Sequence, residues 1–171
     1  PRDVGAEAAA LAVVADVPLI AEPSSNARGP ASLNCGRLLL GTELASDVER
    51  VIVYGHPTLS RPVTSLLSRR DVDLIVVTDT PSWPDPGWQV RQVCGGVLLD
   101  ASSGGWGERW RHADRRLSEL VADQYATDET GGRLAAGVVN ALTDRDTLFV
   151  GPSQIVRELD LAPWPTLPPL V

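Results

Sequence analysis

Two short apolar runs in the first half of the chain have the composition of buried strands. Residues 48–54 centre on Val51, Ile52 and Val53, and residues 72–78 centre on Leu-Ile-Val-Val. Neither run shows the polar alternation of a half-exposed strand, which is typical of a parallel sheet covered on both faces. We therefore predict buried strands here. Weaker patterns predict a short strand at 16–21, an edge strand at 88–93 and a final buried strand at 147–150 that stops at Gly151-Pro152.

Helical periodicity occupies most of the remaining sequence. The strongest pattern covers residues 105–126, where an apolar stripe recurs at helical spacing and consists of Trp106, Trp110, Ala113, Leu117, Leu120, Val121 and Tyr125. The Ala-rich residues 4–15 predict a helix with Leu11, Val14 and Ala15 on one side. Further helices are predicted at 60–70, with Ser60 as N-cap, at 129–142 and, more weakly, at 33–41, with loops at 24–31 and 79–87.

Strands that alternate with helices imply parallel pairing through crossover connections. We predict an α/β fold, doubly wound, with a mainly parallel sheet and helices on both faces. The 171 residues suffice for one domain with a fragment of a second. Because the predicted helix at 4–15 has no strand before it, we expect the first strand of this domain to be missing from the chain.

Composition narrows the class of protein. The chain has no Met and begins with Pro1, so we expect an internal piece of a longer polypeptide. All fifteen basic residues are Arg, as a GC-rich genome would give, which makes any single Arg weak evidence of function. The net charge of −7 argues against binding to nucleic acid or to an anionic membrane. No apolar stretch approaches the roughly 18 residues of a membrane span, and residues 1–10 do not have the basic n-region of a signal peptide.

The two cysteines, Cys35 and Cys94, are far apart in the sequence and have no His at metal-ligand spacing. We interpret them as free, buried thiols of a cytoplasmic protein rather than as a disulfide or a zinc site. The sequence also contains neither a G-x-G-x-x-G pattern nor a Walker A pattern, so it does not support a dinucleotide or ATP site.

The turn after the predicted strand at 48–54 carries the first candidate site. Residues 51–63 lead into a helix and place Arg61 near its N-terminus, where a cation is unfavourable for the helix dipole. Ligands of open α/β sheets bind beyond strand ends, so Arg61 is a candidate for binding an anion; a solvated Arg beside a crossover is the alternative. His56 in the same turn is interpreted as a surface residue, because no partner stands at catalytic spacing.

The second candidate site follows the predicted strand at 147–150, where Ser153 and Arg157 come directly after Gly151-Pro152. Both residues would leave the carboxyl end of a buried strand, which is where α/β folds place ligands. The alternative is an ordinary Ser N-cap followed by a solvated Arg. Geometry alone leaves these two interpretations open.

Other polar groups are interpreted structurally. The hydroxyl-rich segment 21–28 is either a substrate loop or, more simply, an ordinary turn. Asp79 and Asp85 flank Trp83 in a Pro-rich surface loop, and His112 lies on a solvated helix face. Tryptophans could form a binding platform, but Trp106 and Trp110 belong to a predicted core stripe and are assigned to packing.

Three segments in order resemble the MenD family, the 2-succinyl-5-enolpyruvyl-6-hydroxy-3-cyclohexene-1-carboxylate synthases of menaquinone biosynthesis, and actinobacterial members in particular. They are Leu-Ile-Ala-Glu-Pro-Ser-Ser at 19–25, Val-Ile-Val-Tyr-Gly-His-Pro-Thr-Leu-Ser-Arg-Pro-Val at 51–63 and Leu-Phe-Val-Gly-Pro-Ser-Gln-Ile-Val-Arg at 148–157. The resemblance covers essentially the whole chain. It implies a central α/β domain over residues 1–143 and the beginning of a C-terminal thiamine-diphosphate-binding domain over residues 144–171.

The resemblance also implies a reaction and a role for the candidate residues. Members of this family are transferases that decarboxylate 2-oxoglutarate on thiamine diphosphate, with Mg²⁺, and add the resulting carbanion to isochorismate. Both substrates are dicarboxylates, which Arg binds through two parallel hydrogen bonds. Arg61, Ser153 and Arg157 align with substrate-binding positions of the family. Their implied role is binding and orientation, whereas the cofactor supplies the covalent chemistry.

The family's cofactor-activating Glu and Gly-Asp-Gly magnesium motif do not occur in this sequence. The resemblance thus implies a fragment that is inactive alone, binds no thiamine diphosphate or metal itself, and works with the N- and C-terminal domains of the same chain in a homo-oligomer, a dimer or tetramer. The family's feedback-inhibition arginines align with His56 and Ser82, so that regulation is not expected. The competing hypothesis is a non-catalytic Rossmann-type nucleotide-binding or regulatory domain.

Overall fold

The computed structural model of the chain describes residues 3–127, 131–165 and 171. The chain divides into two compact units, one formed by residues 1–36 together with 101–171 and the other by residues 37–100. The domain boundary predicted between residues 143 and 144 concerns the family's domains and stays a prediction.

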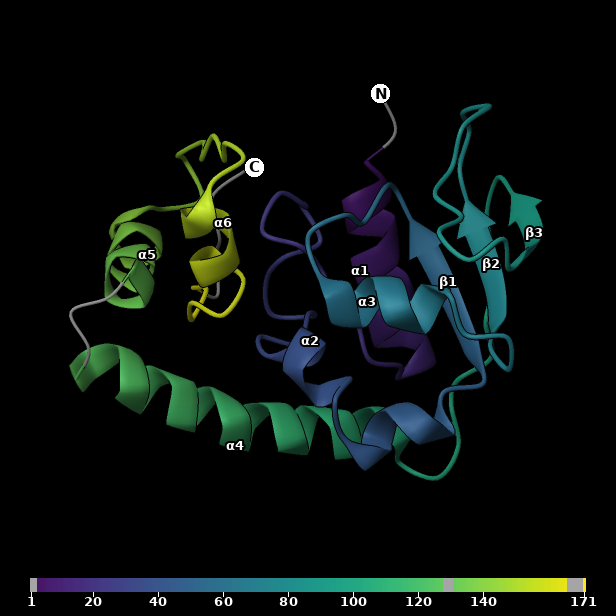
Figure 1. The fold of residues 1–171 in the computed structure, drawn as a ribbon, viewed down its shortest axis with the longest axis horizontal. Coiled ribbons are helices and arrows are strands. Elements are labelled where there is room, and N and C mark those ends of the chain that lie inside the picture. Colours follow the sequence, from purple (N-terminus) through teal and green to yellow (C-terminus); the bar gives the residue numbers. More distant parts are fainter. Residues whose placement is uncertain (1–2, 128–130, 166–170) are drawn as a thin grey trace. The chain divides into compact units, whose positions relative to one another are not determined.

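The unit of residues 37–100 contains a parallel three-stranded sheet. Its strands are β1 (Arg50–Tyr54), β2 (Asp73–Val77) and β3 (Val90–Cys94), with β2 in the centre (Figure 1). Ile52 pairs with Ile75 across β1 and β2, and the register between β2 and β3 shifts after Leu74. The strands predicted at 48–54, 72–78 and 88–93 are confirmed, the last as an edge strand.

The core of this unit lies between the sheet and the helix that connects β1 to β2. This helix is α3 (Arg61–Leu67), whose Leu67 packs with Val53, Leu74 and Val76 of the sheet. A short 3₁₀ turn, η1 (Glu43–Asp47), precedes β1. A parallel sheet whose strands are joined through a helix is an α/β fold, so the predicted fold class is confirmed and is consistent with a Rossmann-like domain of a thiamine-diphosphate enzyme.

The unit of residues 1–36 and 101–171 is helical in its described part. It contains α1 (Val4–Ala15), α4 (Trp106–Thr127), α5 (Gly131–Ala141) and α6 (Gln154–Leu159), and the single turn α2 (Gly36–Leu39) begins at its edge in the sequence. Helices α5 and α6 pack together around Ala135, Val139, Leu159 and Ala162 (Figure 1). The long helix predicted at 105–126 is confirmed. The predicted helix start at 129 lies outside the described residues.

Helix α1 forms where predicted, and its buried face consists of small residues. Its buried residues are Gly5, Ala8, Ala12 and Ala15, whereas Val14 is 73% exposed. The reason is a close backbone approach, since a Cβ added at Gly5 would lie 2.7 Å from the backbone nitrogen of Ala27. Only small side chains fit such a contact, so the packed face of α1 includes Ala15 but not Val14.

Two predicted strands do not form among the described residues, and one predicted helix is shorter. At 16–21 no strand forms, and Asp16 ends α1 with a left-handed φ of 52°. The Leu19 carbonyl accepts a 2.8 Å bond from the backbone nitrogen of Leu33, the Ala21 carbonyl accepts from the Arg28 side chain, and Pro18 has no N–H to donate. At 147–150 only Thr147 makes an isolated bridge, and Phe149 is 92% exposed while its neighbours pack inward. The helix predicted at 33–41 is reduced to α2.

Candidate functional site

Arg61 is the first residue of α3 and is exposed. The turn before it uses Gly55 at a φ of 73°, a left-handed conformation that favours glycine. Ser60 occupies the predicted N-cap position but makes no side-chain capping bond. Within the described ranges Arg61 has no hydrogen-bond or ion-pair partner, so its guanidinium faces solvent and is free to bind an anion.

Ser153 and Arg157 are brought together on α6, Ser153 at the N-cap position and Arg157 four residues later. Both are exposed, and the Ser153 hydroxyl makes no capping bond. Arg157 Nη1 donates to Gln154 Oε1 at 3.4 Å, and Gln154 Nε2 donates to Glu158 Oε1 at 3.1 Å. The opposite oxygen of Glu158 accepts a 3.2 Å bond from the Tyr125 hydroxyl of α4. The surface of α6 is therefore tied to α4 through a short polar chain.

The other polar residues considered in the sequence are either exposed to solvent or bound to the backbone of their own loop. His56 and His112 are exposed, as predicted. Asp85 accepts bonds from the backbone nitrogens of Gln89, at 2.7 Å, and of Val90, so its carboxylate closes a loop and is not paired with Asp79.

The predicted packing of the tryptophans on α4 is confirmed for Trp110, which is buried and meets Trp106 edge to face at 5.7 Å between ring centroids. Both cysteines are free thiols, as predicted; Cys35 is buried, whereas Cys94 is half-buried.

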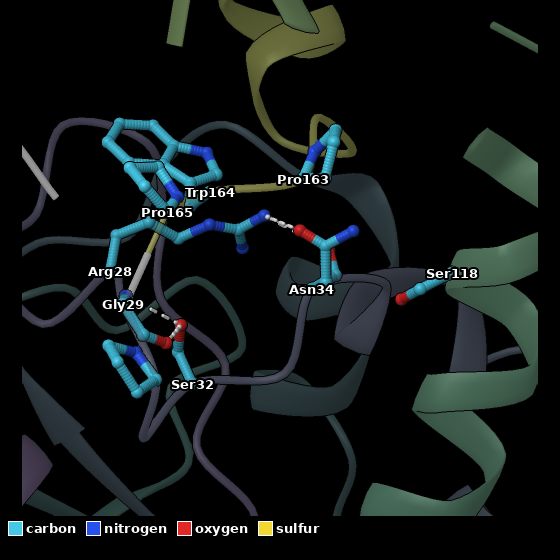
Figure 2. A pocket seen from close by; sticks show the side chains of 9 residues that line it. Arg28, Gly29, Ser32, Asn34, Ser118, Pro163, Trp164 and Pro165 are labelled. Carbon is cyan, nitrogen blue, oxygen red and sulfur yellow. Dashed lines mark hydrogen bonds between the residues drawn. The ribbon is translucent and has the colours of Figure 1, made fainter. Parts of the chain in front are cut away.

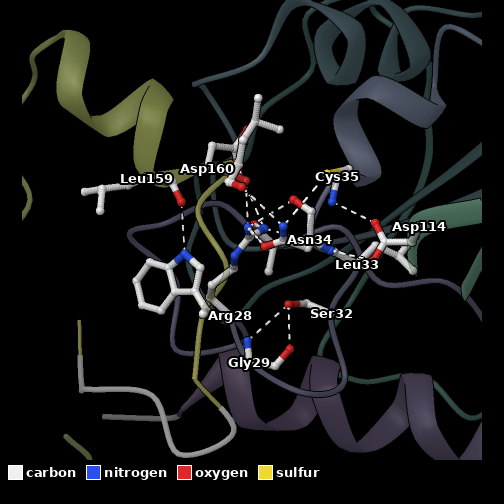
Figure 3. A network of polar contacts seen from close by, with 12 residues as sticks. Arg28, Gly29, Ser32, Leu33, Asn34, Cys35, Asp114, Leu159 and Asp160 are labelled. Carbon is white, nitrogen blue, oxygen red and sulfur yellow. Dashed lines mark hydrogen bonds and ion pairs between the residues drawn. The ribbon is translucent and has the colours of Figure 1, made fainter. Parts of the chain in front are cut away.

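A buried arginine organises the helical unit. Arg28 is 4% exposed, and its guanidinium donates to backbone carbonyls of three distant segments (Figure 3). Nη1 donates to Ala21 at 3.1 Å and to Leu33 at 3.2 Å, while Nη2 donates to the Asp160 carbonyl at 2.6 Å and to Asn34 Oδ1 at 3.0 Å. A buried cation needs such a set of acceptors, because an unpaired one is costly to remove from water.

Asp114 of α4 binds the backbone just before α2, next to the Arg28 network. It is buried, and its two carboxylate oxygens accept from the backbone nitrogens of Asn34, at 2.9 Å, and Cys35, at 2.7 Å (Figure 3). These N–H groups precede the short helix α2, where no intrahelical acceptor exists for them. Asp114 lies one helical turn beyond Trp110, so a carboxylate continues the packed face of α4.

A cavity of about 260 Å³ opens beside Arg28 and Trp164 (Figure 2). Its wall combines hydroxyl and amide groups with proline rings and consists of Arg28, Gly29, Pro30, Ser32, Asn34, Ser118, Pro163, Trp164 and Pro165. The Arg28 guanidinium lies 5.9 Å from the Trp164 ring centroid. Because this guanidinium already donates to protein carbonyls, we assign it to holding the wall together rather than to a ligand.

Cys35 lies next to this cavity wall, and its Sγ is 3.6 Å from the Ser118 hydroxyl. Burial raises the pKa of the Cys35 thiol, and the nearby Asp114 carboxylate adds to the increase, while the Ser118 hydrogen bond opposes it. The thiol therefore stays protonated near neutral pH and is a poor nucleophile.

Sequence reasoning missed Arg28, Asn34 and Asp114. Asp114 had a visible signal, since a carboxylate at a core position of an amphipathic helix needs a partner. Arg28 had none, because every basic residue of the chain is Arg. In the described part of the chain no cluster of three or more His, Cys, Asp or Glu residues could hold a metal ion. No helix among the described residues is long and apolar enough to cross a bilayer.

Three curated proteins that resemble the chain share one name. No protein-family model matches the chain. It is 39% identical, over 93% of its length, to the 2-succinyl-5-enolpyruvyl-6-hydroxy-3-cyclohexene-1-carboxylate synthase of Nocardioides sp. and covers 32% of that protein. Synthases of the same name from Kineococcus radiotolerans and Arthrobacter sp. are 40% and 38% identical over 94% and 98% of the chain, which covers 31% and 30% of them. The chain spans about a third of the length of these curated relatives.

Proposed function

We propose a function for this chain from its family. The chain belongs to the MenD family of 2-succinyl-5-enolpyruvyl-6-hydroxy-3-cyclohexene-1-carboxylate synthases and corresponds to a fragment of such a synthase. The full-length protein would be a transferase of menaquinone biosynthesis that joins a succinyl unit derived from 2-oxoglutarate to isochorismate. The observation that carries this proposal is the identity of 38–40% across more than nine-tenths of the chain. The chain would be the central segment of that enzyme, located in the cytoplasm.

In this proposal Arg61, Ser153 and Arg157 bind the carboxylates of the substrates. Both substrates carry two carboxylates, and a planar guanidinium matches a carboxylate with two parallel hydrogen bonds. The exposure of all three side chains supports the role, because none is taken up by the buried cores of their units. Arg157 is further oriented by its bond to Gln154. A hydroxyl such as that of Ser153 adds a single directed hydrogen bond.

The described residues do not fit thiamine diphosphate or Mg²⁺, since no group of three or more His, Cys, Asp or Glu residues among them could hold a metal ion and the sequence has no phosphate-binding glycine pattern. In the full-length enzyme the cofactor supplies the carbanion chemistry. We assign its binding and its metal to the N- and C-terminal domains of the same polypeptide. We further propose that the 171-residue chain is inactive alone and that the full-length protein is a homo-oligomer, a dimer or tetramer, that binds neither nucleic acid nor membranes.

The proposal is tested on the full-length protein, supplied with thiamine diphosphate and Mg²⁺. We expect consumption of 2-oxoglutarate and isochorismate in equal amounts, dependent on both the cofactor and the metal. A folded full-length protein that consumes neither substrate would refute the assignment.

The competing nucleotide-binding hypothesis is tested by calorimetry of the 171-residue chain with ATP and NAD. We expect no heat of binding, because the turn after β1 lacks a phosphate-binding glycine pattern. Firm binding of either nucleotide would favour the competing hypothesis.

A further inference from the structure

We propose that Arg28 is a positioning residue for α6, the helix that begins after Ser153 and carries Arg157. The consequence for substrate binding rests on the proposed function. The positioning itself rests on contacts within the helical unit of residues 1–36 and 101–171. Arg28 would act through α6, not by touching a substrate.

Helix α6 needs an external anchor because of its length. It has six residues, Gln154–Leu159, and isolated helices this short are not stable in water. The last carbonyls of a helix also lack intrahelical donors. The orientation of α6 therefore depends on the groups that satisfy its C-terminal end.

Three side chains donate to three consecutive carbonyls at that end. Trp164 Nε1 donates to Leu159 at 2.9 Å, Arg28 Nη2 donates to Asp160 at 2.6 Å, and Asn34 Nδ2 donates to Leu161 at 3.2 Å. Arg28 also places a positive charge at the negative end of the helix dipole, and its Nη1 lies 3.8 Å from the Asp160 carboxylate.

Arg28 connects this helix end to a rigid support. The same guanidinium binds the carbonyls of Ala21 and Leu33, so it links both ends of the loop at 22–32 to α6. Asp114 of α4 fixes the backbone at Asn34 and Cys35 in turn. A continuous set of hydrogen bonds therefore runs from α4 through Asn34 and Arg28 to the end of α6 (Figure 3).

Lysine is the informative replacement at position 28. It keeps the charge, but its single ammonium cannot hold carbonyls of three separate segments in fixed directions. Arg28→Lys should therefore loosen α6 while leaving the charge of the unit unchanged. Arg133→Lys, at an exposed position of α5, is the matched control.

The first measurement is hydrogen–deuterium exchange of the 171-residue chain. In Arg28→Lys we expect the amides of residues 154–162 to exchange about tenfold faster or more, with the amides of α4 and α5 unchanged. Arg133→Lys should exchange like the parent chain. Unchanged exchange in α6, or an equal increase in α4, α5 and α6, would overturn the proposal.

The second measurement uses the full-length protein and separates this proposal from the proposed function. We expect Arg28→Lys to raise the KM for a dicarboxylate substrate several-fold with kcat nearly unchanged, in the same direction as Arg157→Gln. If Arg157→Gln raises the KM and Arg28→Lys does not, the positioning role is wrong. If neither raises the KM although α6 exchanges faster in Arg28→Lys, the role of Arg157 in substrate binding fails and the anchoring of α6 by Arg28 stands.

A third variant applies if Arg28→Lys does not fold. Trp164→Phe keeps an aromatic ring beside Arg28, although a smaller one, and removes the donor to the Leu159 carbonyl. Faster exchange confined to residues 154–162 would support side-chain anchoring of α6. Parent-like exchange in this variant would overturn it.

Discussion

Arg28 donates a 2.6 Å hydrogen bond to the backbone carbonyl of Asp160, a residue 132 positions further along the chain. The bond joins a loop near the beginning of the sequence to the end of α6. Asp160 is itself buried, and its carboxylate lies 3.8 Å from the same guanidinium. Long-range order in the helical unit therefore depends on a buried polar network as well as on apolar packing.

Replacing Asp114 tests how much this network contributes to stability. Asp114→Asn keeps the shape but leaves one of the two N–H groups, of Asn34 or Cys35, without an acceptor. We expect the free energy of unfolding to fall by about 2 kcal/mol, measured by urea denaturation. Asp123→Asn, on the exposed part of α4, should change it by less than about 0.5 kcal/mol. Equal effects of the two substitutions would contradict the assigned role of Asp114.

Two glycines of α5 should respond to alanine in opposite directions. A Cβ at Gly132 would overlap the ring of Tyr125, whereas a Cβ at Gly137 would meet no atom within 4 Å. We expect Gly132→Ala to destabilise the chain by about 1–3 kcal/mol through overpacking. Gly137→Ala should stabilise it by about 0.5–1 kcal/mol, because Ala is the better helix former. Thermal denaturation of both variants measures the difference, and two changes of the same sign would refute the packing of Tyr125 on α5.

Cys35 should be unreactive in the folded chain. Its side chain is buried, and that burial raises the pKa of its thiol, so little thiolate forms near neutral pH. In a Cys94→Ser variant, we expect the remaining thiol to react with a disulfide reagent roughly a hundredfold more slowly in buffer than in denaturant. A rate in buffer close to the rate in denaturant would show that Cys35 is accessible.

The exposed cluster around Glu108 gives a prediction about acid stability. Hydrogen bonds from Arg115, at 2.7 Å, and from Arg111, at 3.2 Å, lower the pKa of Glu108 below its ordinary value of 4.5. Since the unfolded chain then takes up the proton first, the stabilising effect is present above the ordinary pKa. It is lost as the pH falls through the lower pKa of the folded state.

The test compares unfolding of the parent chain and Glu108→Gln at about pH 7 and about pH 3. The parent should lose slightly more stability in acid than the variant, by a small amount because all three side chains are exposed to solvent. Glu119→Gln, on an exposed part of the same helix, should behave like the parent. A Glu108→Gln variant with the parent's pH dependence would contradict the effect.

Two kinds of element were predicted correctly from the sequence: the helix whose apolar pattern repeats over several turns, and the strands that find neighbours in a sheet. The apolar runs at 51–53 and 74–77 became β1 and β2, and the periodic stripe on residues 106–125 became α4. The run at 147–150 looked similar but found no strand partner in the described chain. A strand is stabilised by its neighbours, and a single-sequence pattern does not say whether a neighbour is present.

The sequence indicated the candidate binding residues but not the network that holds them in place. Their position after predicted strands made Arg61, Ser153 and Arg157 candidates, and the resemblance to the family gave them a role. The structure places all three at exposed helix starts or on a helix surface. The network that supports α6 was not predicted. Arg28 and Asp160 lie far apart in the sequence, and their relationship appears only once the loop and the helix end have folded together.

In the proposed function, this chain supplies carboxylate-binding residues to a synthase. The most direct test is the KM for 2-oxoglutarate and for isochorismate in full-length proteins that carry Arg157→Gln or the control Arg133→Gln. We predict that Arg157→Gln raises the KM for at least one of the two substrates by about 10- to 100-fold, the effect of losing a hydrogen-bonded ion pair, and that Arg133→Gln leaves both unchanged. Parent-like KM values for both substrates in Arg157→Gln would contradict the claim.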